Sequence, residues 1–142
     1  MRGACNVQEP LDIGEPEISR ETIVQASDLA KIWDAELRLI CIQFPDLVGF
    51  SDYGLIDPGD RLRHAAEDQL SELARSNQYT QKRASTVVRF GAVLPEILAE
   101  ADEWHADLIA LGSHYPSIAT YILGSNAVHI VRHAKCSVLV IR

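Results

Sequence analysis

Two glycine-containing segments in the last third of the chain have the residue types of an anion-binding site. Gly112 follows the short apolar segment 107–111, and Gly124, Ser125 and Asn126 come just before an apolar helical stripe. Glycine lets backbone N–H groups approach an anion closely, and the first turn of a helix presents unpaired N–H groups and a favourable dipole. The two segments together can hold the phosphates of a nucleotide without a lysine.

The charge distribution agrees with an anion at this end of the chain. The 142 residues carry 13 Lys and Arg against 20 Asp and Glu, a net charge of -7. Residues 108–142 contain no Asp or Glu and carry +3, whereas residues 1–107 carry -10. The acidic total disfavours nucleic acid and anionic membranes as partners. It does not disfavour one small anion bound by backbone amides.

The elements that must position these segments follow from the period of the apolar residues. Short apolar runs predict strands at 36–43, 85–90, 107–111 and 136–141, with a weaker one at 5–9. Gln8 and Glu9 are poor residues for a strand buried on both faces. Apolar residues three and four apart predict four helices. Their stripes are Ile23, Ala26, Ala30 and Trp33; Leu62, Ala66, Leu70 and Leu73; Leu94, Ile97, Ala101 and Trp104; and Leu123, Ala127, Val131 and Ala134.

This alternation predicts one α/β domain over residues 1–142. We expect a doubly wound, five-stranded parallel sheet in the order 3-2-1-4-5, with helices on both faces. Ligands of such sheets bind at the carboxyl ends of the strands where the winding reverses, between the first and fourth strands. The residues expected there are Pro10, Leu11 and Asp12 after the first strand, and Leu111, Gly112, Ser113 and His114 around the end of the fourth.

Residues 106–142 resemble the C-terminal half of universal stress proteins, and most closely those of the small, single-domain F/G type. The resemblance is carried by Ser113-His114-Tyr115-Pro116 and by Thr120-Tyr121-Ile122-Leu123-Gly124-Ser125-Asn126. It implies a UspA-like domain of the adenine nucleotide alpha hydrolase-like fold, usually dimeric, that binds ATP. Mg²⁺ is expected with the phosphates.

The resemblance also implies roles for individual residues. Gly112 and its neighbours would hold ribose and phosphate, Gly124 and Ser125 would hold phosphates, and Asp12 would lie near the ribose and adenine. Ile42 would line the adenine pocket. Two features depart from the family's G-x-x-G pattern. Tyr115 replaces the second glycine, and the interval from Gly112 to Gly124 is one residue shorter. Pro116 stiffens the turn further.

Several of these residues have a second interpretation in terms of structure alone. Asp12 can accept hydrogen bonds in an Asx-turn instead of binding a ligand. His114 can donate to a phosphate or shuttle a proton, or it can bond nearby backbone. Ile42 can be an ordinary core residue. His129 and His133 have the i, i+4 spacing of zinc ligands, but no third ligand lies near them in sequence. We therefore expect solvent-side histidines and no metal site.

The remaining features concern assembly and location. Cys5, Cys41 and Cys136 are odd in number and widely spaced, which is typical of reduced, mostly buried thiols in a cytoplasmic protein. The sequence contains no apolar run long enough for a membrane span and no signal-like start. The segment Cys136 to Ile141 is an apolar edge strand, which predicts a homodimer through that strand.

The sequence thus predicts a cytoplasmic universal stress protein, an ATP-binding regulatory or protective dimer of the stress response. One alternative is a slow ATPase or self-phosphorylating protein, in which Ser113, His114 or Ser125 orients water or receives phosphate. No Walker lysine, arginine finger or dedicated base is evident, so hydrolysis would be slow at most. The other alternative is a nucleotide-free scaffold that acts through protein partners, with the phosphate site closed by Tyr115 and Pro116.

Overall fold

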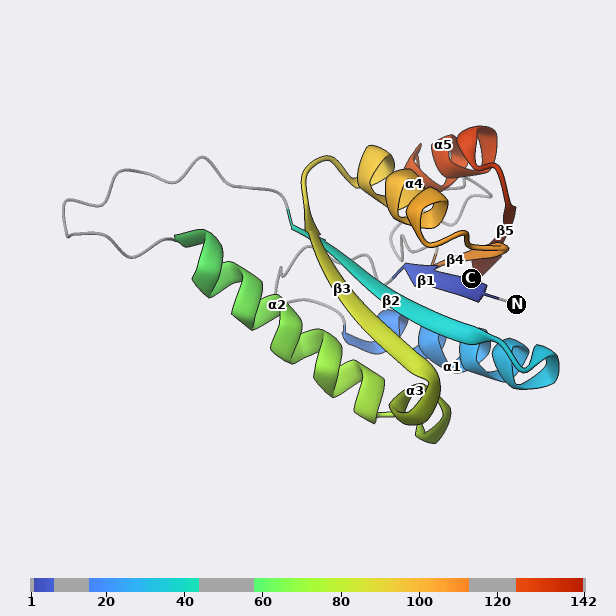
Figure 1. Cartoon of the computed structure of the whole chain (residues 1–142), viewed down its shortest axis with the longest axis horizontal. Coiled ribbons are helices and arrows are strands. Elements are labelled where there is room, and N and C mark those ends of the chain that lie inside the picture. Colours follow the sequence, from blue (N-terminus) through green and yellow to red (C-terminus); the bar gives the residue numbers. More distant parts are fainter. Residues whose placement is uncertain (1, 7–15, 44–57, 113–124, 142) are drawn as a thin grey trace.

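The computed structural model describes residues 2–6, 16–43, 58–112 and 125–141, which form five strands and five helices (Figure 1). The elements are β1 (Arg2–Asn6), α1 (Pro16–Trp33), β2 (Glu36–Gln43), α2 (Pro58–Arg75), α3 (Gln78–Arg83), β3 (Ala84–Phe90), α4 (Val93–Glu103), β4 (Leu108–Gly112), α5 (Ser125–His133) and β5 (Ser137–Ile141).

The strands form one sheet in which every paired neighbour is parallel. Its order is β3-β2-β1-β4-β5, so β1 is the central strand and β5 is at one edge. The predicted α/β class, with helices alternating with parallel strands, is confirmed. None of the described helices is long and apolar enough to cross a membrane.

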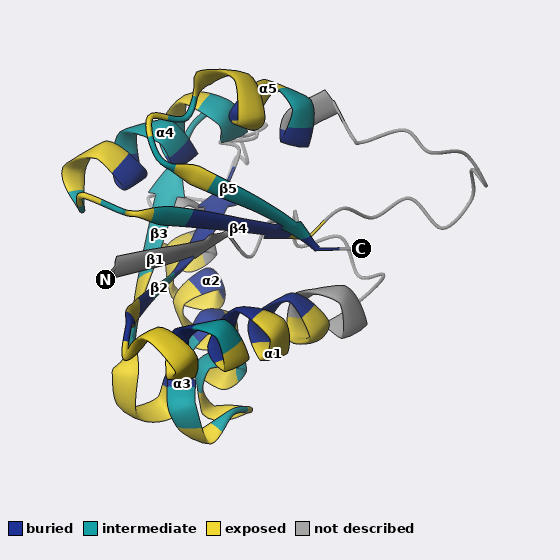
Figure 2. Ribbon diagram, turned by 90° about the vertical axis from the view of Figure 1, so that its right-hand side faces the viewer, coloured by how far each residue is buried: buried dark blue, intermediate teal, exposed yellow. Residues whose placement is uncertain are grey.

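The helices cover both faces of the sheet. In Figure 1, α4 and α5 lie on one side of it, and α1, α2 and α3 lie on the other. The side chains of β2 alternate accordingly, as the period of two in a strand requires. Leu37, Leu39 and Cys41 pack in the cluster beneath α1 and α2, whereas Ile40 and Ile42 pack beneath α4 and α5. Most residues of β2 and β4 are buried, so these two strands are covered on both faces of the sheet (Figure 2).

The first strand lies three residues earlier than predicted. It covers Arg2–Asn6 rather than 5–9, and Gln8 and Glu9 lie outside the described residues. The segment RGACN has little intrinsic preference for a strand. It forms one because β2 and β4 supply backbone partners on both sides, with Asn6 opposite Ile40 and Leu111.

Two features of the helices also differ from the prediction. The short helix α3 was not expected; Asn77 caps it by accepting a hydrogen bond from the Tyr79 N–H at 2.8 Å. The stripe of α5 contains Ala127 and Ile130, and Val131 is 49% exposed instead of buried. Trp33, at the end of α1, is likewise 46% exposed rather than part of the core.

A buried carboxylate fastens α4 to the strands beneath it. Glu100 is 3% exposed and accepts hydrogen bonds from Arg38 of β2 and Arg89 of β3, both at 2.6 Å. Arg89 also donates to Glu96 and Glu103, and the Arg38 guanidinium lies 4.5 Å over the Trp104 ring. Burial raises the pKa of Glu100, but the hydrogen bonds from the two arginines outweigh it and hold the pKa below its ordinary value.

We predict that this carboxylate makes stability depend on pH. A lowered folded-state pKa means that the stabilisation is fully present above about pH 4.5 and is lost as the pH falls through the folded-state pKa. Glu100→Gln should lower the free energy of unfolding at pH 7 by about 3 kcal/mol, because it removes the buried anion that the partly buried Arg38 and Arg89 share. It should also flatten the acid limb of urea unfolding measured between pH 3 and 7.

The matched control is Glu103→Gln, which removes a carboxylate that is 65% exposed from the same arginine. It should change stability by less than about 1 kcal/mol. Equal losses in the two variants would show that the buried position of Glu100 contributes nothing special.

Candidate functional site

The ends of β1 and β4 lie side by side at the carboxyl edge of the sheet. Asn6, the last residue of β1, is in register with Leu111, and Gly112 follows as the last residue of β4. Leu111 is 3% exposed, whereas Gly112 is exposed. The two strands continue into helices on opposite faces of the sheet, so this is the point where the winding reverses. An exposed glycine without a side chain therefore ends a buried strand at the predicted binding edge.

Helix α5 begins close to the same edge. It starts at Ser125, and Ala127 in its first turn belongs to the buried cluster that contains Leu111. The first turn of a helix carries backbone N–H groups without intrahelical acceptors. The structure thus brings two predicted segments, the end of β4 and the start of α5, to one end of the sheet. Their backbone groups are the kind that bind phosphate.

The other predicted site residues are described only in part. Pro10, Leu11, Asp12, Ser113, His114 and Gly124 lie outside the described residues, as do Tyr115 and Pro116. Ser125 and Asn126 are placed at the start of α5, but their side chains are not described. Ile42 is 4% exposed in the cluster beneath α4. Its placement agrees with a core residue, and its predicted role beside adenine stays a prediction.

Gly91 shapes the edge where β3 turns into α4. Its φ is +144°, a conformation that side chains rarely adopt, and its N–H donates to the Gln43 carbonyl at the end of β2 at 3.0 Å. A Cβ atom there would lie 2.9 Å from Oε1 of Glu96, which is bound to Arg89. Gly91 therefore joins the ends of β2 and β3 in a way that no other residue does without strain.

Sequence reasoning missed one polar residue at this edge, Gln43. It is 5% exposed at the end of a strand whose preceding three residues are apolar and buried. The sequence signal was an amide directly after three apolar residues. If such an amide is buried with them, it needs hydrogen-bond partners. Phe90, which pairs with Gln43 on β3, was predicted as a strand residue and not as part of this edge.

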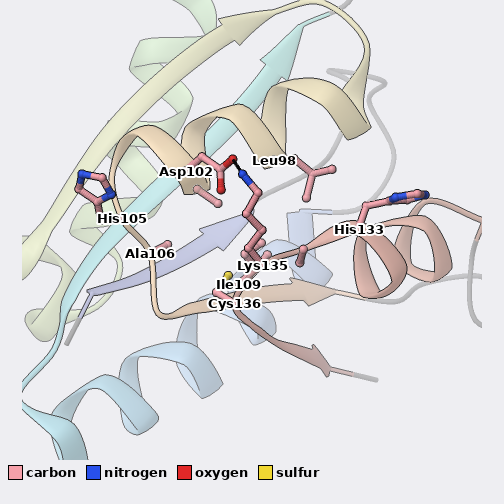
Figure 3. A pocket seen from close by; sticks show the side chains of 10 residues that line it. Leu98, Asp102, His105, Ala106, Ile109, His133, Lys135 and Cys136 are labelled. Carbon is pink, nitrogen blue, oxygen red and sulfur yellow. Dashed lines mark hydrogen bonds and ion pairs between the residues drawn. The ribbon is translucent and has the colours of Figure 1, made fainter.

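The opposite, amino edge of the sheet has a cavity of about 230 Å³ between the ends of α4 and α5 (Figure 3). Asp102 and Lys135 form an ion pair at its rim, with Oδ2 and Nζ 2.5 Å apart. Burial raises the pKa of the Cys136 thiol in its lining, which keeps the thiol protonated and poorly nucleophilic. Cys136 and the buried Cys41 are both free thiols. The cavity does not coincide with the predicted nucleotide edge.

The histidine pair of α5 is exposed, as expected. The rings of His129 and His133 are stacked with centroids 6.4 Å apart. Over the part of the chain that the structure describes, no group of three or more His, Cys, Asp or Glu side chains is arranged to hold a metal ion.

Comparison with known proteins decides the family. Residues 10–142 match the universal stress protein family. The chain belongs to the universal stress protein family. It is 34% identical over 137 residues to universal stress protein G of Shigella flexneri, with 94% of this chain and 95% of that protein covered. It is 35% identical to universal stress protein G of Salmonella typhimurium over the same length and coverage. The predicted resemblance to UspA-like, F/G-type proteins is confirmed.

Solved structures of universal stress proteins share the fold. The UspA protein from Lactobacillus plantarum superposes with a TM-score of 0.70 at 19% identity, covering 99% of this chain and 97% of that one. A universal stress protein in complex with cAMP gives 0.66 at 18% identity, with coverages of 99% and 96%. A family member from Arabidopsis thaliana with AMP bound gives 0.60 at 16% identity, with coverages of 99% and 89%.

We predict that Gly91→Ala destabilises the protein by about 2 kcal/mol. The substituted residue keeps a strained positive φ, and its Cβ displaces Glu96 from its contact. The measurement is urea unfolding at pH 7. Ala92 is the matched position, because its φ of −74° is ordinary and it caps α4 without a side-chain hydrogen bond. Ala92→Ser should not destabilise and should add up to about 1 kcal/mol as a helix cap. Unchanged stability of Gly91→Ala would contradict the proposed strain.

Proposed function

We propose that this chain is a regulatory or protective universal stress protein of the cytoplasm, which binds an adenine nucleotide at the carboxyl edge between β1 and β4. The observation that carries the proposal is the exposed Gly112 at the end of the buried strand β4, beside the end of β1 and at the same end of the sheet as the start of α5. In a doubly wound sheet a ligand binds at this position.

The chemistry of the edge favours phosphate. The N–H groups near Gly112 and in the first turn of α5 supply donors that need no side chain. The segment 108–142, which contains both Gly112 and the start of α5, has no carboxylate to repel an anion. Gly124 and Ser125 complete the proposed phosphate contacts, with Asp12 and His114 beside the ribose and phosphates. The proposed ligand is ATP with Mg²⁺. Its other proposed neighbours are Pro10, Leu11, Leu111, Ser113 and Asn126.

The known structures support an adenine nucleotide over other anions. One solved family member holds cAMP and another holds AMP. These ligands share adenine, ribose and phosphate, and both proteins align with nearly the whole of this chain. The proposal extends this ligand class to a chain in which Tyr115 replaces a glycine of the phosphate loop.

The proposed assembly is a homodimer through the C-terminal strand. Strand β5 pairs with β4 on one side and is the edge of the described sheet (Figure 2). Its apolar residues Val138, Leu139 and Val140 are only half-buried in one chain. An exposed apolar edge invites pairing with another strand, and a two-fold axis lets two copies satisfy each other.

The first test is nucleotide binding by the purified protein. Mass spectrometry should identify any retained nucleotide, and calorimetric titration with Mg-ATP should show binding. Gly112→Val should weaken ATP binding about tenfold or more, because its side chain blocks approach to charge-assisted N–H contacts. Valine suits a strand, so the fold should persist.

The control for this test is Thr86→Val, an exposed position on the distant edge strand β3. It should bind ATP as the unaltered chain does. Absence of both retained nucleotide and binding at millimolar ATP would overturn the proposal and favour the nucleotide-free scaffold. Steady ADP release that Gly112→Val abolishes would favour the slow ATPase.

The dimer has a separate prediction. Val140→Lys should yield a monomer at micromolar concentration in light scattering coupled to size exclusion, because a charged residue on the shared edge cannot be buried against its copy. Thr86→Lys adds the same charge to the opposite edge strand and should leave the dimer intact. A dimer that survives Val140→Lys would contradict this interface.

A further inference from the structure

The cavity of about 230 Å³ at the amino edge of the sheet lies opposite the proposed nucleotide site. Its walls are the last turns of α4, the residues that join α4 to β4, and the residues that join α5 to β5 (Figure 3). Leu98, Ala101 and Ile109 supply apolar surface to it. An apolar cavity of about 150 Å³ is large enough to hold benzene. A single ring with a short substituent therefore fits this cavity.

The last turn of α4, at the rim of the cavity, is negatively charged. It contains Asp102 and Glu103 and no basic residue. The C-terminus of a helix is the negative end of its dipole, so a carboxylate there is unfavourable unless a cation lies beside it. Helix α5 also ends at this cavity, and the basic residues of its last turn, Arg132 and His133, are exposed. Two helix ends and Asp102 thus favour a cation in the cavity.

Lys135 supplies that cation in this structure. Its Nζ lies 2.5 Å from Oδ2 of Asp102, and the Lys135 side chain is 78% exposed. In Figure 3 this side chain reaches from the segment before β5 to α4, whereas the rings of His105 and His133 stand at opposite ends of the lining. An exposed ion pair contributes little to stability, because water solvates both charges and the lysine loses conformational freedom in it. A second ammonium group can therefore displace Lys135 from Asp102.

The thiol of Cys136 reports the electrostatic potential in the lining. Burial raises its pKa, and the negative charges of Asp102 and Asp107 raise it further. Carboxylates that disfavour a thiolate favour a cation at the same place, for the same electrostatic reason. A thiol that stays protonated is also a poor nucleophile, so a ligand beside it is held without a covalent bond.

We propose that this cavity binds a small primary amine whose apolar body is about one ring in size. The ring packs against Leu98, Ala101 and Ile109, and the ammonium group takes the place of the Lys135 ammonium on Asp102. A neutral ligand of the same shape gains only the apolar contact, and an anion is repelled by Asp102 and the helix ends. The inference is independent of nucleotide binding, because the two sites lie at opposite edges of the sheet.

The test begins with the unaltered protein and three probes that share one ring, benzylamine, benzyl alcohol and benzoate. Titration at pH 7 followed by NMR of the backbone amides gives each affinity and locates the site. Benzylamine should bind about fivefold more tightly than benzyl alcohol, the upper range for a half-exposed ion pair, and benzoate should bind most weakly. The largest shifts should fall on the amides of Ala106, Lys135 and Cys136. Equal affinity for benzylamine and benzyl alcohol would overturn the proposal without any variant.

Two variants should change the amine affinity in opposite directions. Asp102→Asn removes the anion and should weaken benzylamine binding about fivefold, to the level of benzyl alcohol. Lys135→Met keeps an unbranched stem and removes the competing ammonium, so benzylamine should bind about threefold more tightly while benzyl alcohol changes by less than about twofold. Both side chains are at least half exposed, so the fold should persist in both variants.

The matched control is Asp28→Asn, which removes the acid of an exposed ion pair with Lys31 on α1, where Nζ and Oδ1 are 2.8 Å apart. It should bind all three probes as the unaltered chain does. Ala106→Leu places a larger apolar side chain in the lining and should weaken binding of all three probes about tenfold, because it fills the cavity. Ala134→Leu provides a second filled cavity if the first variant does not fold.

The outcomes separate this inference from the proposed function. No binding of benzylamine at millimolar concentration would overturn the amine site and leave nucleotide binding untouched. Benzylamine affinity that Lys135→Met leaves unchanged would show that the ligand does not replace the lysine, which also overturns the proposal. Binding that persists in the filled variants would place the amine elsewhere and have the same consequence. Opposite changes in Asp102→Asn and Lys135→Met, with Asp28→Asn unchanged, support it.

Discussion

The backbone pairing of β1 on both of its sides determines where the rest of the structure lies. This strand has five residues and little sequence preference for its conformation, and β2 and β4 flank it in parallel register. Because all paired neighbours are parallel, every strand ends at the same edge. Asn6 of β1, Ile40 of β2 and Leu111 of β4 therefore lie side by side near that edge.

The two faces of the sheet are held by different physics. The face beneath α1 and α2 is apolar, built from residues such as Ile23, Leu39 and Leu70. The face beneath α4 has an apolar centre but ends toward β3 in the cluster of Glu100 with Arg38 and Arg89. A buried charge cluster needs each partner in place, so it fixes α4 on β2 and β3 more specifically than apolar contact alone. Gly91, between β3 and α4, lies within this fixed frame.

The alternation of apolar periods was sufficient to predict four strands to within one residue and the α/β class. It was insufficient for β1, where Gly3 and Asn6 carry no strand signal and the neighbouring strands decide the conformation. The helix α3 was missed because Asn77 acts as a cap through a side-chain hydrogen bond that spacing does not reveal. Gly112 was found through its position after an apolar strand. The buried position of Gln43 could not be predicted, because burial depends on the whole fold.

The contacts of Tyr79 bear on the order in which the chain folds. Its hydroxyl lies 3.0 Å from the Ala30 carbonyl and 2.6 Å from that of Ala35, at the corner between α1 and β2. These partners are 49 and 44 residues earlier in the chain. During synthesis the corner therefore leaves the ribosome well before the residue that secures it. The first strand-helix-strand unit is completed by a later segment, and the chain gains its stability as a cooperative whole rather than from its N-terminal part outward.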